Sequence, residues 1–166
     1  MPYDPATDPL LEVRNLSIDF RDDRRTSSRA VDDISFSVPR HRTVALVGES
    51  GSGKSVTALS VLGLLAGNAR ISPASGILFA GRQLLRQPRS VLQRVRGCDI
   101  SMIFQEPMTS LNPVFTVGAQ IVEALQLHTA LARREAAQRA VDLLAEVGIP
   151  DPGLRFHAHP HELSGG

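Results

Sequence analysis

Gly48-Glu-Ser-Gly-Ser-Gly-Lys-Ser55 is the stretch that decides the fold of this 166-residue chain. It matches the pattern G-x-x-x-x-G-K-S/T, whose glycines let successive backbone N–H groups converge around an anion. The apolar run at 43–47 precedes it and predicts a strand buried on both faces of a parallel sheet. Apolar residues three and four apart between 58 and 65 predict a helix that ends near Gly67. A strand, a glycine-rich turn and a helix, in that order, are the context in which this pattern binds phosphate.

Each residue type in this stretch has a chemical reason. Lys54 supplies a compact positive charge for the β and γ phosphates of a nucleotide, and the Ser55 hydroxyl can ligate a Mg²⁺ ion that bridges them. Lys54 is also the only lysine in the sequence, which a plain glycine turn leaves unexplained. The predicted nucleotide site comprises Gly48, Glu49, Ser50, Gly51, Ser52, Gly53, Lys54, Ser55 and Val56.

The composition is that of a globular chain, with 42% hydrophobic and 21% charged residues. The formal net charge of +1 creates no overall field toward nucleic acid, and we expect no nucleic-acid partner. The single Cys98 can form no internal disulfide. No apolar stretch approaches the roughly 20 residues that span a bilayer, and the N-terminus lacks a secretory signal. The sequence therefore predicts a cytoplasmic chain.

Apolar periodicity predicts the remaining elements. The expected strands lie at 10–20, 34–38, 77–79 and 100–104, and the expected helices at 91–95, 117–127 and 133–147. The charged segment 21–29 is expected to form an exposed hairpin loop, and Gly148 to stop the last helix. Because strands come first and helices last, we expect two lobes.

Two further motifs make the chain resemble the ATP-binding-cassette (ABC) ATPases over essentially its whole length. Ile103-Phe-Gln105 is similar to the Q-loop of that family, and Leu163-Ser-Gly-Gly166 is similar to the opening of its signature motif. The runs 105–113 and 160–163 resemble in particular the nucleotide-binding subunits of bacterial oligopeptide and dipeptide importers.

The resemblance implies an α/β fold of the P-loop NTPase type. In that fold an antiparallel β lobe is joined to a RecA-like core and a helical lobe. We expect residues 1–104 to hold the β lobe with the phosphate-loop part of the core. Residues 105–166 would then hold the Q-loop and the helical lobe up to the signature motif.

The same resemblance implies a transport function. The chain would be an ATP-binding subunit that couples ATP binding and hydrolysis to peptide import across the bacterial inner membrane, with ATP and Mg²⁺ as cofactors. Its implied partners are transmembrane permease subunits, a second ATP-binding subunit paired head to tail as a homodimer or heterodimer, and, indirectly, a periplasmic peptide-binding protein. Its implied location is peripheral, on the cytoplasmic face of that membrane.

The resemblance also implies roles for single residues. Lys54 and Gln105 would be catalytic, and the Gln105 amide oxygen would join Ser55 in the Mg²⁺ shell and sense the γ phosphate. Phe20 would stack on adenine. The residues expected to hold the γ phosphate of the partner's nucleotide, through backbone N–H groups, are Ser164, Gly165 and Gly166.

The end of the chain leaves alternatives open. It stops before the family's Walker B strand, catalytic glutamate and switch histidine, so we expect a part of a catalytic domain that lacks hydrolysis by itself. One alternative is an inactive truncated product, and another is an ABC-type ATPase that acts on DNA or ribosomes without a permease. A P-loop kinase would leave 163–166 unexplained.

The alternating histidines at 157, 159 and 161 are not expected to bind metal, because no Cys or Asp joins them.

Overall fold

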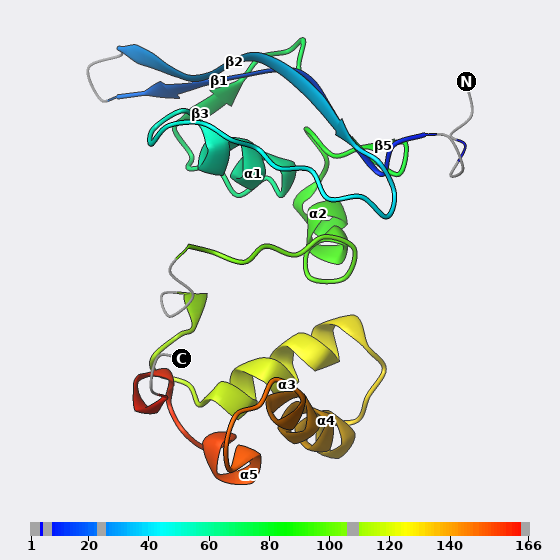
Figure 1. The fold of residues 1–166 in the computed structure, drawn as a ribbon, viewed down its shortest axis with the longest axis vertical. Helices are drawn as coiled ribbons and strands as arrows, with labels where there is room; N and C mark the ends of the chain where they lie inside the picture. The colour runs from blue at the N-terminus through cyan, green and yellow to red at the C-terminus, as the bar shows by residue number, and fades with distance from the viewer. Residues whose placement is uncertain (1–3, 5–7, 23–25, 106–109, 164–166) are drawn as a thin grey trace. The chain divides into compact units, whose positions relative to one another are not determined.

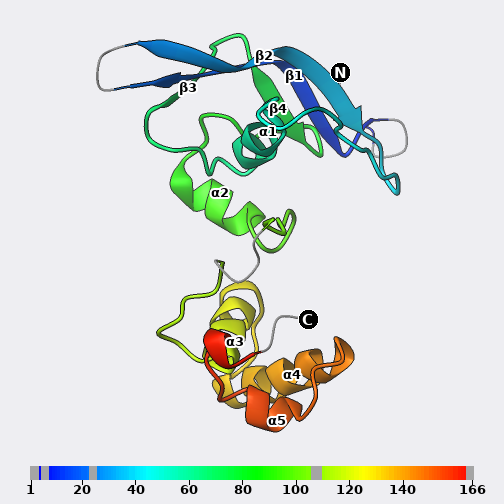
Figure 2. The ribbon, with the colours of Figure 1, turned by 60° about the vertical axis from the view of Figure 1, so that its left-hand side comes forward.

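The computed structural model describes residues 4, 8–22, 26–105 and 110–163, drawn in colour in Figures 1 and 2. The chain divides into two compact units, Met1–Gln93 and Arg94–Gly166. The division into lobes expected at 104/105 stays a prediction. Among the described residues, no helix is long and apolar enough to cross a membrane.

In the described residues, the first unit is an antiparallel sheet with helix α1 beside it. Its elements are β1 (Leu11–Arg21), β2 (Ser27–Val38), α1 (Lys54–Val61), β3 (Ala69–Ile71), β4 (Gly76–Phe79) and β5 (Arg82–Gln83). The strand order is β2-β1-β4-β5, and β3 also pairs with β1. β1 is therefore the central strand: its first half pairs with β4 and its last residues pair with β3. The strands expected at 10–20, 34–38 and 77–79 are confirmed.

Helix α1 covers one face of the sheet (Figure 2), and buried side chains of β1, β4 and α1 form the core of this unit. Val13, Leu16 and Ile18 of β1 and Ile77 of β4 are each at most 1% exposed. The buried side chains of α1 are Thr57, Ser60 and Val61. The spacing from Val13 to Leu16 is three residues rather than two, because the pairing of β1 with β2 is irregular between them. That irregularity returns the apolar side chains to the core face.

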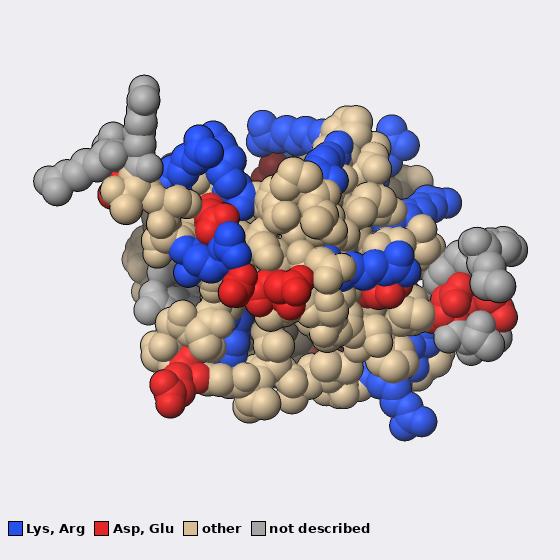
Figure 3. Space-filling model, turned by 90° about the horizontal axis from the view of Figure 1, so that it is seen from above, with Lys and Arg blue, Asp and Glu red and all other residues tan. Residues whose placement is uncertain are grey.

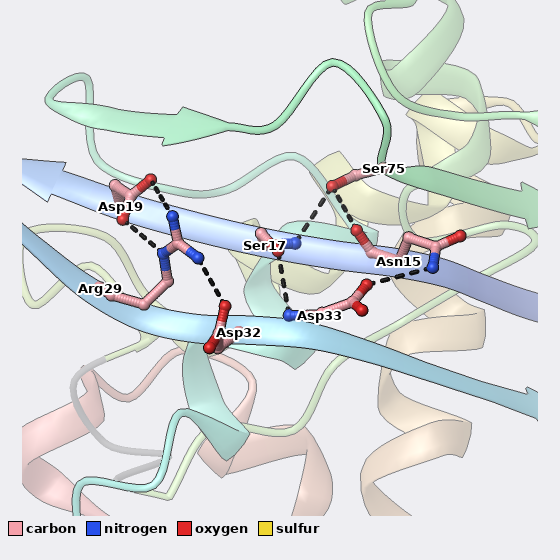
Figure 4. A network of polar contacts seen from close by, with 7 residues as sticks. All are labelled: Asn15, Ser17, Asp19, Arg29, Asp32, Asp33 and Ser75. Atoms are coloured by element: carbon pink, nitrogen blue, oxygen red, sulfur yellow. Dashed lines mark hydrogen bonds and ion pairs between the residues drawn. The ribbon is translucent and has the colours of Figure 1, made fainter.

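Polar side chains satisfy the backbone at this irregularity (Figure 4). Asn15 has a φ of 46° and Asp33 a φ of 45°, and the Asn15 amide donates to the Asp33 carboxylate at 3.1 Å. The hydroxyl of Ser75 donates to the Asn15 carbonyl at 2.9 Å and accepts from the backbone N–H of Ser17 at 3.1 Å. Ser75 is only 3% exposed, so it ties the loop before β4 to β1 with its own polar atoms paired.

The face of the sheet turned away from α1 carries mixed charges. Arg29 of β2 donates to Asp19 of β1 at 2.7 Å and to Asp32 at 2.5 Å, and hydrogen bonding, first of all to Asp19, raises the pKa of Arg29 above its already high ordinary value. Figure 3 looks down on the molecule from above, where basic and acidic side chains lie interspersed. Exposed ion pairs of this kind contribute little to stability. This face is therefore a solvated surface.

The second unit is helical. Its helices are α3 (Val117–His128), α4 (Arg133–Glu146), α5 (Pro152–Arg155) and the short 3-10 turn η2 (Pro160–Glu162), whereas α2 (Arg89–Val95) spans the point where the units divide. Val122, Ala136 and Ala140 form its core, where the alanines let α3 and α4 pack closely. The Thr116 hydroxyl caps α3 by accepting from the N–H of Ala119 at 3.3 Å. The helices expected at 91–95, 117–127 and 133–147 are confirmed.

Helices α4 and α1 each end just before a glycine with a positive φ. After α4, Gly148 has a φ of 78° and donates to the Ala145 carbonyl, while Ile149 donates to the Leu144 carbonyl. This is a Schellman end, and it confirms Gly148 as the predicted stop. The same geometry at Gly63, with a φ of 62°, ends α1 at Val61. The prediction that this helix continues to the region of Gly67 is therefore wrong.

Two predicted strands are wrong. Residues 43–47 form no strand, and Val47 is 90% exposed. Residues 101–104 are also irregular, with only Ile100 in an isolated bridge to Arg96, and Ile103 is 92% exposed. A strand is defined by its partners, and among the described residues no strand pairs with either segment. The loop expected at 21–29 is shorter, because Arg21 still belongs to β1 and β2 begins at Ser27.

Candidate functional site

The glycine-rich turn between 48 and 55 is built around two left-handed residues. Gly51 has a φ of 81° and Gly53 a φ of 88°, which are backbone angles that side chains with a Cβ rarely adopt. The N–H of Ser52 donates to the Glu49 carbonyl at 3.2 Å and closes the turn. Gly53 is the N-cap of α1, and no side chain caps this helix end with a hydrogen bond in the part of the chain described. The first amides of α1 therefore point out of the helix as donors for an anion.

Lys54 lies at the centre of this turn. Its ammonium group donates to the carbonyl oxygens of Gly48 at 2.8 Å and Glu49 at 2.6 Å, and lies 3.2 Å from the Ser52 hydroxyl. The side chain is thus held over the loop that starts α1. A positive charge, a helix N-terminus and glycine amides meet there, which is an arrangement suited to phosphate groups.

The turn packs directly against β2. A Cβ at Gly53 would lie 2.4 Å from the Ala30 carbonyl oxygen and 3.1 Å from a methyl of Val31. Helix α1 also holds this glycine: Thr57 donates to the Gly53 carbonyl through its hydroxyl at 2.9 Å and through its N–H at 2.8 Å. Thr57 is 2% exposed. Sequence reasoning missed Thr57, although a hydroxyl residue four positions after Gly53 can bond back to it in a helix.

A pocket of about 430 Å³ lies between the turn and β2. Its walls include Val31 and Ile34 from β2, Gly48 and Lys54 from the turn, and Thr57 from α1. The β2 wall also includes the charged residues Arg29 and Asp32, so the pocket combines apolar side chains with polar groups. Such a mixture is usual for a small-molecule site, and the volume is in the usual range. The structure thus brings Lys54, Gly48 and Gly51 together at a pocket.

The metal that the sequence implies needs few protein ligands. Mg²⁺ is usually held by one or two side-chain oxygens together with substrate phosphates and water. The Ser55 hydroxyl, exposed at the start of α1, is an oxygen donor of this kind, so the turn fits such a site. Of the described residues, no three His, Cys, Asp or Glu side chains are grouped in a way that could hold a metal, the histidines at 157, 159 and 161 included.

The other predicted site residues are placed as follows. Phe20 lies half-buried near the end of β1, opposite Ser28 of β2 and Ala69 of β3. Gln105 is exposed in the second unit, on a segment without regular structure. Glu49, Ser50 and Val56 belong to the turn and the first turn of α1. The residues Ser164, Gly165 and Gly166 lie outside the described residues. The roles proposed for all of these stay predictions.

A second pocket lies within the helical unit. It measures about 590 Å³, and its walls include Val122, Glu123 and Leu127 of α3, Arg133 of α4, and Phe156. It is larger than the pocket at Lys54, and no glycine is among the described residues that line it. Its apolar lining residues include Val122, Leu127 and Phe156, and Glu123 and Arg133 carry charges of opposite sign.

Comparison with known structures defines the class of fold. The chain matches the dimeric structure of a post-hydrolysis state of the ATP-binding cassette MJ0796 bound to ADP and Pi, with a TM-score of 0.77 and 18% identity. The match covers 93% of this chain and 63% of that chain. The fold is therefore the α/β fold of an ABC-type nucleotide-binding domain, as the sequence predicts.

Residues 31–166 match the family model described as ABC transporter, and the chain belongs to that family. It is 55% identical over 160 residues to the peptidoglycan transport ATP-binding protein YejF of Agrobacterium fabrum. It is 50% identical over 161 residues to the putative peptide import ATP-binding protein BMEII0206 of Brucella melitensis. Both matches cover 96% of this chain, but only 29% and 48% of those proteins. The chain spans less than half the length of these relatives.

Proposed function

We propose that this chain is part of the ATP-binding subunit of an ABC importer for peptides, acting at the cytoplasmic face of the bacterial inner membrane. The observation that carries the proposal is Lys54, which is held over a glycine turn beside an uncapped helix N-terminus and a pocket of about 430 Å³. The names of the relatives, which are peptidoglycan and peptide transport proteins, support the class of solute.

In this proposal different residues bind different parts of the nucleotide. The amides that follow Gly51 and Gly53, with the start of α1, bind the phosphate oxygens, and Lys54 neutralises the β and γ phosphates. Ser55 would hold Mg²⁺ through its hydroxyl oxygen, and the ion would supply positive charge beside the phosphates. Phe20 stacks on adenine. The nucleotide competes with the Gly48 and Glu49 carbonyls for the Lys54 ammonium.

The remaining predicted residues act through partners. Gln105 would offer its amide oxygen as a ligand to Mg²⁺ and would relay the presence of the γ phosphate to the permease. Two ATP-binding subunits pair head to tail, so that Ser164, Gly165 and Gly166 of each one reach the nucleotide of the other. The dimeric form of the MJ0796 structure supports pairing as the arrangement.

The pocket of the helical unit is the surface we propose for the permease. Its apolar wall is formed by Val122, Phe156 and Leu127, and Leu127 is 72% exposed. Glu123 and Arg133 add charges of opposite sign. An amphipathic helix from a cytoplasmic loop of the permease has the matching chemistry: an apolar stripe for the wall and polar residues for the charges.

A titration series tests the nucleotide site. The chain is titrated with a fluorescent ATP analogue in the presence of Mg²⁺, and the analogue is then displaced with unlabelled ATP, ADP or AMP. Because the turn contacts the β and γ phosphates, ATP and ADP are expected to displace the analogue and AMP to compete much more weakly. Binding that does not saturate, or AMP that competes as well as ATP, would contradict the proposal.

A further inference from the structure

The turn that leads into Ser164 is held by one carboxylate. Glu162 accepts a hydrogen bond from the backbone N–H of His159 at 2.6 Å, and its same oxygen lies 3.3 Å from Nδ1 of the His159 ring. Backbone bonds complete the turn: the N–H of Glu162 donates to the His159 carbonyl at 2.9 Å and that of Leu163 to the Pro160 carbonyl at 3.2 Å. The Glu162 side chain thus bonds back to His159, the N-cap residue of η2.

Neighbouring groups also hold the turn that the Glu162 carboxylate closes by bonding to His159, which we call the Glu162 closure. Arg155 of α5 donates to the Glu162 carbonyl at 3.4 Å, which ties the turn to the preceding helix. The rings of His159 and His161 are stacked with their centroids 5.7 Å apart. Of the residues that the structure describes, the titratable and charged groups that face Glu162 are therefore His159 and His161 on its own turn and Arg155 on α5. All of them favour a negative charge on Glu162 when they carry a proton.

We infer that Glu162 is a positioning residue, whose carboxylate fixes the turn from His159 to Leu163 and so sets how the chain enters Ser164. The importance of that entry rests on the proposed function, in which the three residues from Ser164 reach a nucleotide held by the partner. Glu162 itself touches no nucleotide in this account. It acts only through the backbone that precedes Ser164.

The chemistry of the carboxylate makes this closure sensitive to acid. The hydrogen bond from the His159 backbone, followed by the one from its ring, lowers the pKa of Glu162 below its ordinary value of 4.5. A group with a lowered pKa contributes stability above its unfolded pKa and loses it as the pH falls through the folded pKa. The closure is therefore expected to be intact at neutral pH and to open only below about pH 4.5.

Amide hydrogen exchange of the 166-residue chain tests the role. The variants are Glu162→Ala, which removes the acceptor, and Glu162→Gln, which keeps an amide oxygen for the His159 N–H but cannot titrate. At neutral pH we expect protection of the His159 amide to fall about threefold to tenfold in Glu162→Ala and to be largely kept in Glu162→Gln. On acidification the unsubstituted chain should lose this protection, while the Glu162→Gln profile stays flat. Equal protection in all three chains, or the same acid profile in Glu162→Gln, would overturn the inference.

A second readout separates this inference from the proposed function. Mg·ATP-driven pairing of two copies, followed by gel filtration, is expected to be weaker in Glu162→Ala and restored in Glu162→Gln. If the unsubstituted chain does not pair with Mg·ATP, the proposed pairing of two copies through these residues fails, whereas the exchange result still decides the role of Glu162. If pairing occurs and Glu162→Ala pairs as well as the unsubstituted chain, the positioning role is wrong.

Discussion

Replacing Gly53 with alanine is expected to lower the free energy of unfolding of the 1–93 unit by about 2–5 kcal/mol. Two costs add at this residue. Its φ of 88° is a left-handed conformation, which costs a residue with a Cβ about 1–2 kcal/mol. The new methyl would also lie 2.4 Å from the Ala30 carbonyl oxygen, so β2 or the turn has to move. Because that oxygen belongs to the backbone of a strand, the shift is costly, and nucleotide binding should fall with it.

Matched glycines separate the two costs. Gly51 has a φ of 81° but nothing within 4 Å of a Cβ, so Gly51→Ala isolates the backbone cost and should lose only about 1–2 kcal/mol. Gly67 has neither a positive φ nor a neighbour within 4 Å, so Gly67→Ala is expected to lose nothing. Unfolding followed by circular dichroism gives all three values. A Gly53→Ala variant as stable as Gly51→Ala would show that the packing of the turn on β2 is not as described.

The second large effect is expected at Gly118 in α3. A Cβ there would lie 2.3–2.5 Å from three carbons of the Phe156 ring, and Phe156 packs on the core around Val122. Overpacking of this kind costs about 1–3 kcal/mol, while alanine gains about 1 kcal/mol over glycine from helix propensity. Because three ring atoms of Phe156 would contact the new methyl group, we expect the overpacking cost to exceed the gain in helix propensity. Gly118→Ala is therefore expected to destabilise the helical unit in thermal unfolding despite its better propensity.

Two variants check the cause at Gly118. Gly153 lies in α5 with nothing within 4 Å of a Cβ, so Gly153→Ala should be neutral or gain about 0.4–1 kcal/mol. In a Phe156→Leu background the clash partner is smaller, so the cost of Gly118→Ala should shrink. An unchanged cost in that background would mean that the ring is not responsible for the loss.

Local chemistry explains what the sequence could predict. The turn at 48–55, the glycine stop after α4 and the alternation along β1 depend on residues close in the chain, and the structure confirms them. The polar atoms that surround Lys54 also come from its own turn. A motif whose geometry is set within eight residues can be recognised without the rest of the fold.

Long-range packing explains what the sequence could not predict. That Gly53 rests on the Ala30 carbonyl depends on how β2 passes the turn, which no spacing reveals. The apolar run at 43–47 reads as a buried strand, yet strand pairing is a property of neighbours, and in the described residues none pairs with it. Thr57 has no motif of its own, and its role appears only in its bonds to Gly53.

The most direct test of the account is the affinity of the chain for a fluorescent Mg·ATP analogue, measured for the unsubstituted chain, Lys54→Ala and the control Arg82→Ala. Arg82 is an exposed cation of β5 in the same unit, so its loss controls for the removal of one positive charge. A charged hydrogen-bond partner contributes about 1.5–3 kcal/mol, so Lys54→Ala should bind about 10–100-fold more weakly while Arg82→Ala is unchanged. Equal affinity of all three chains, or an equal loss in both variants, would contradict the assignment of this turn as the nucleotide site.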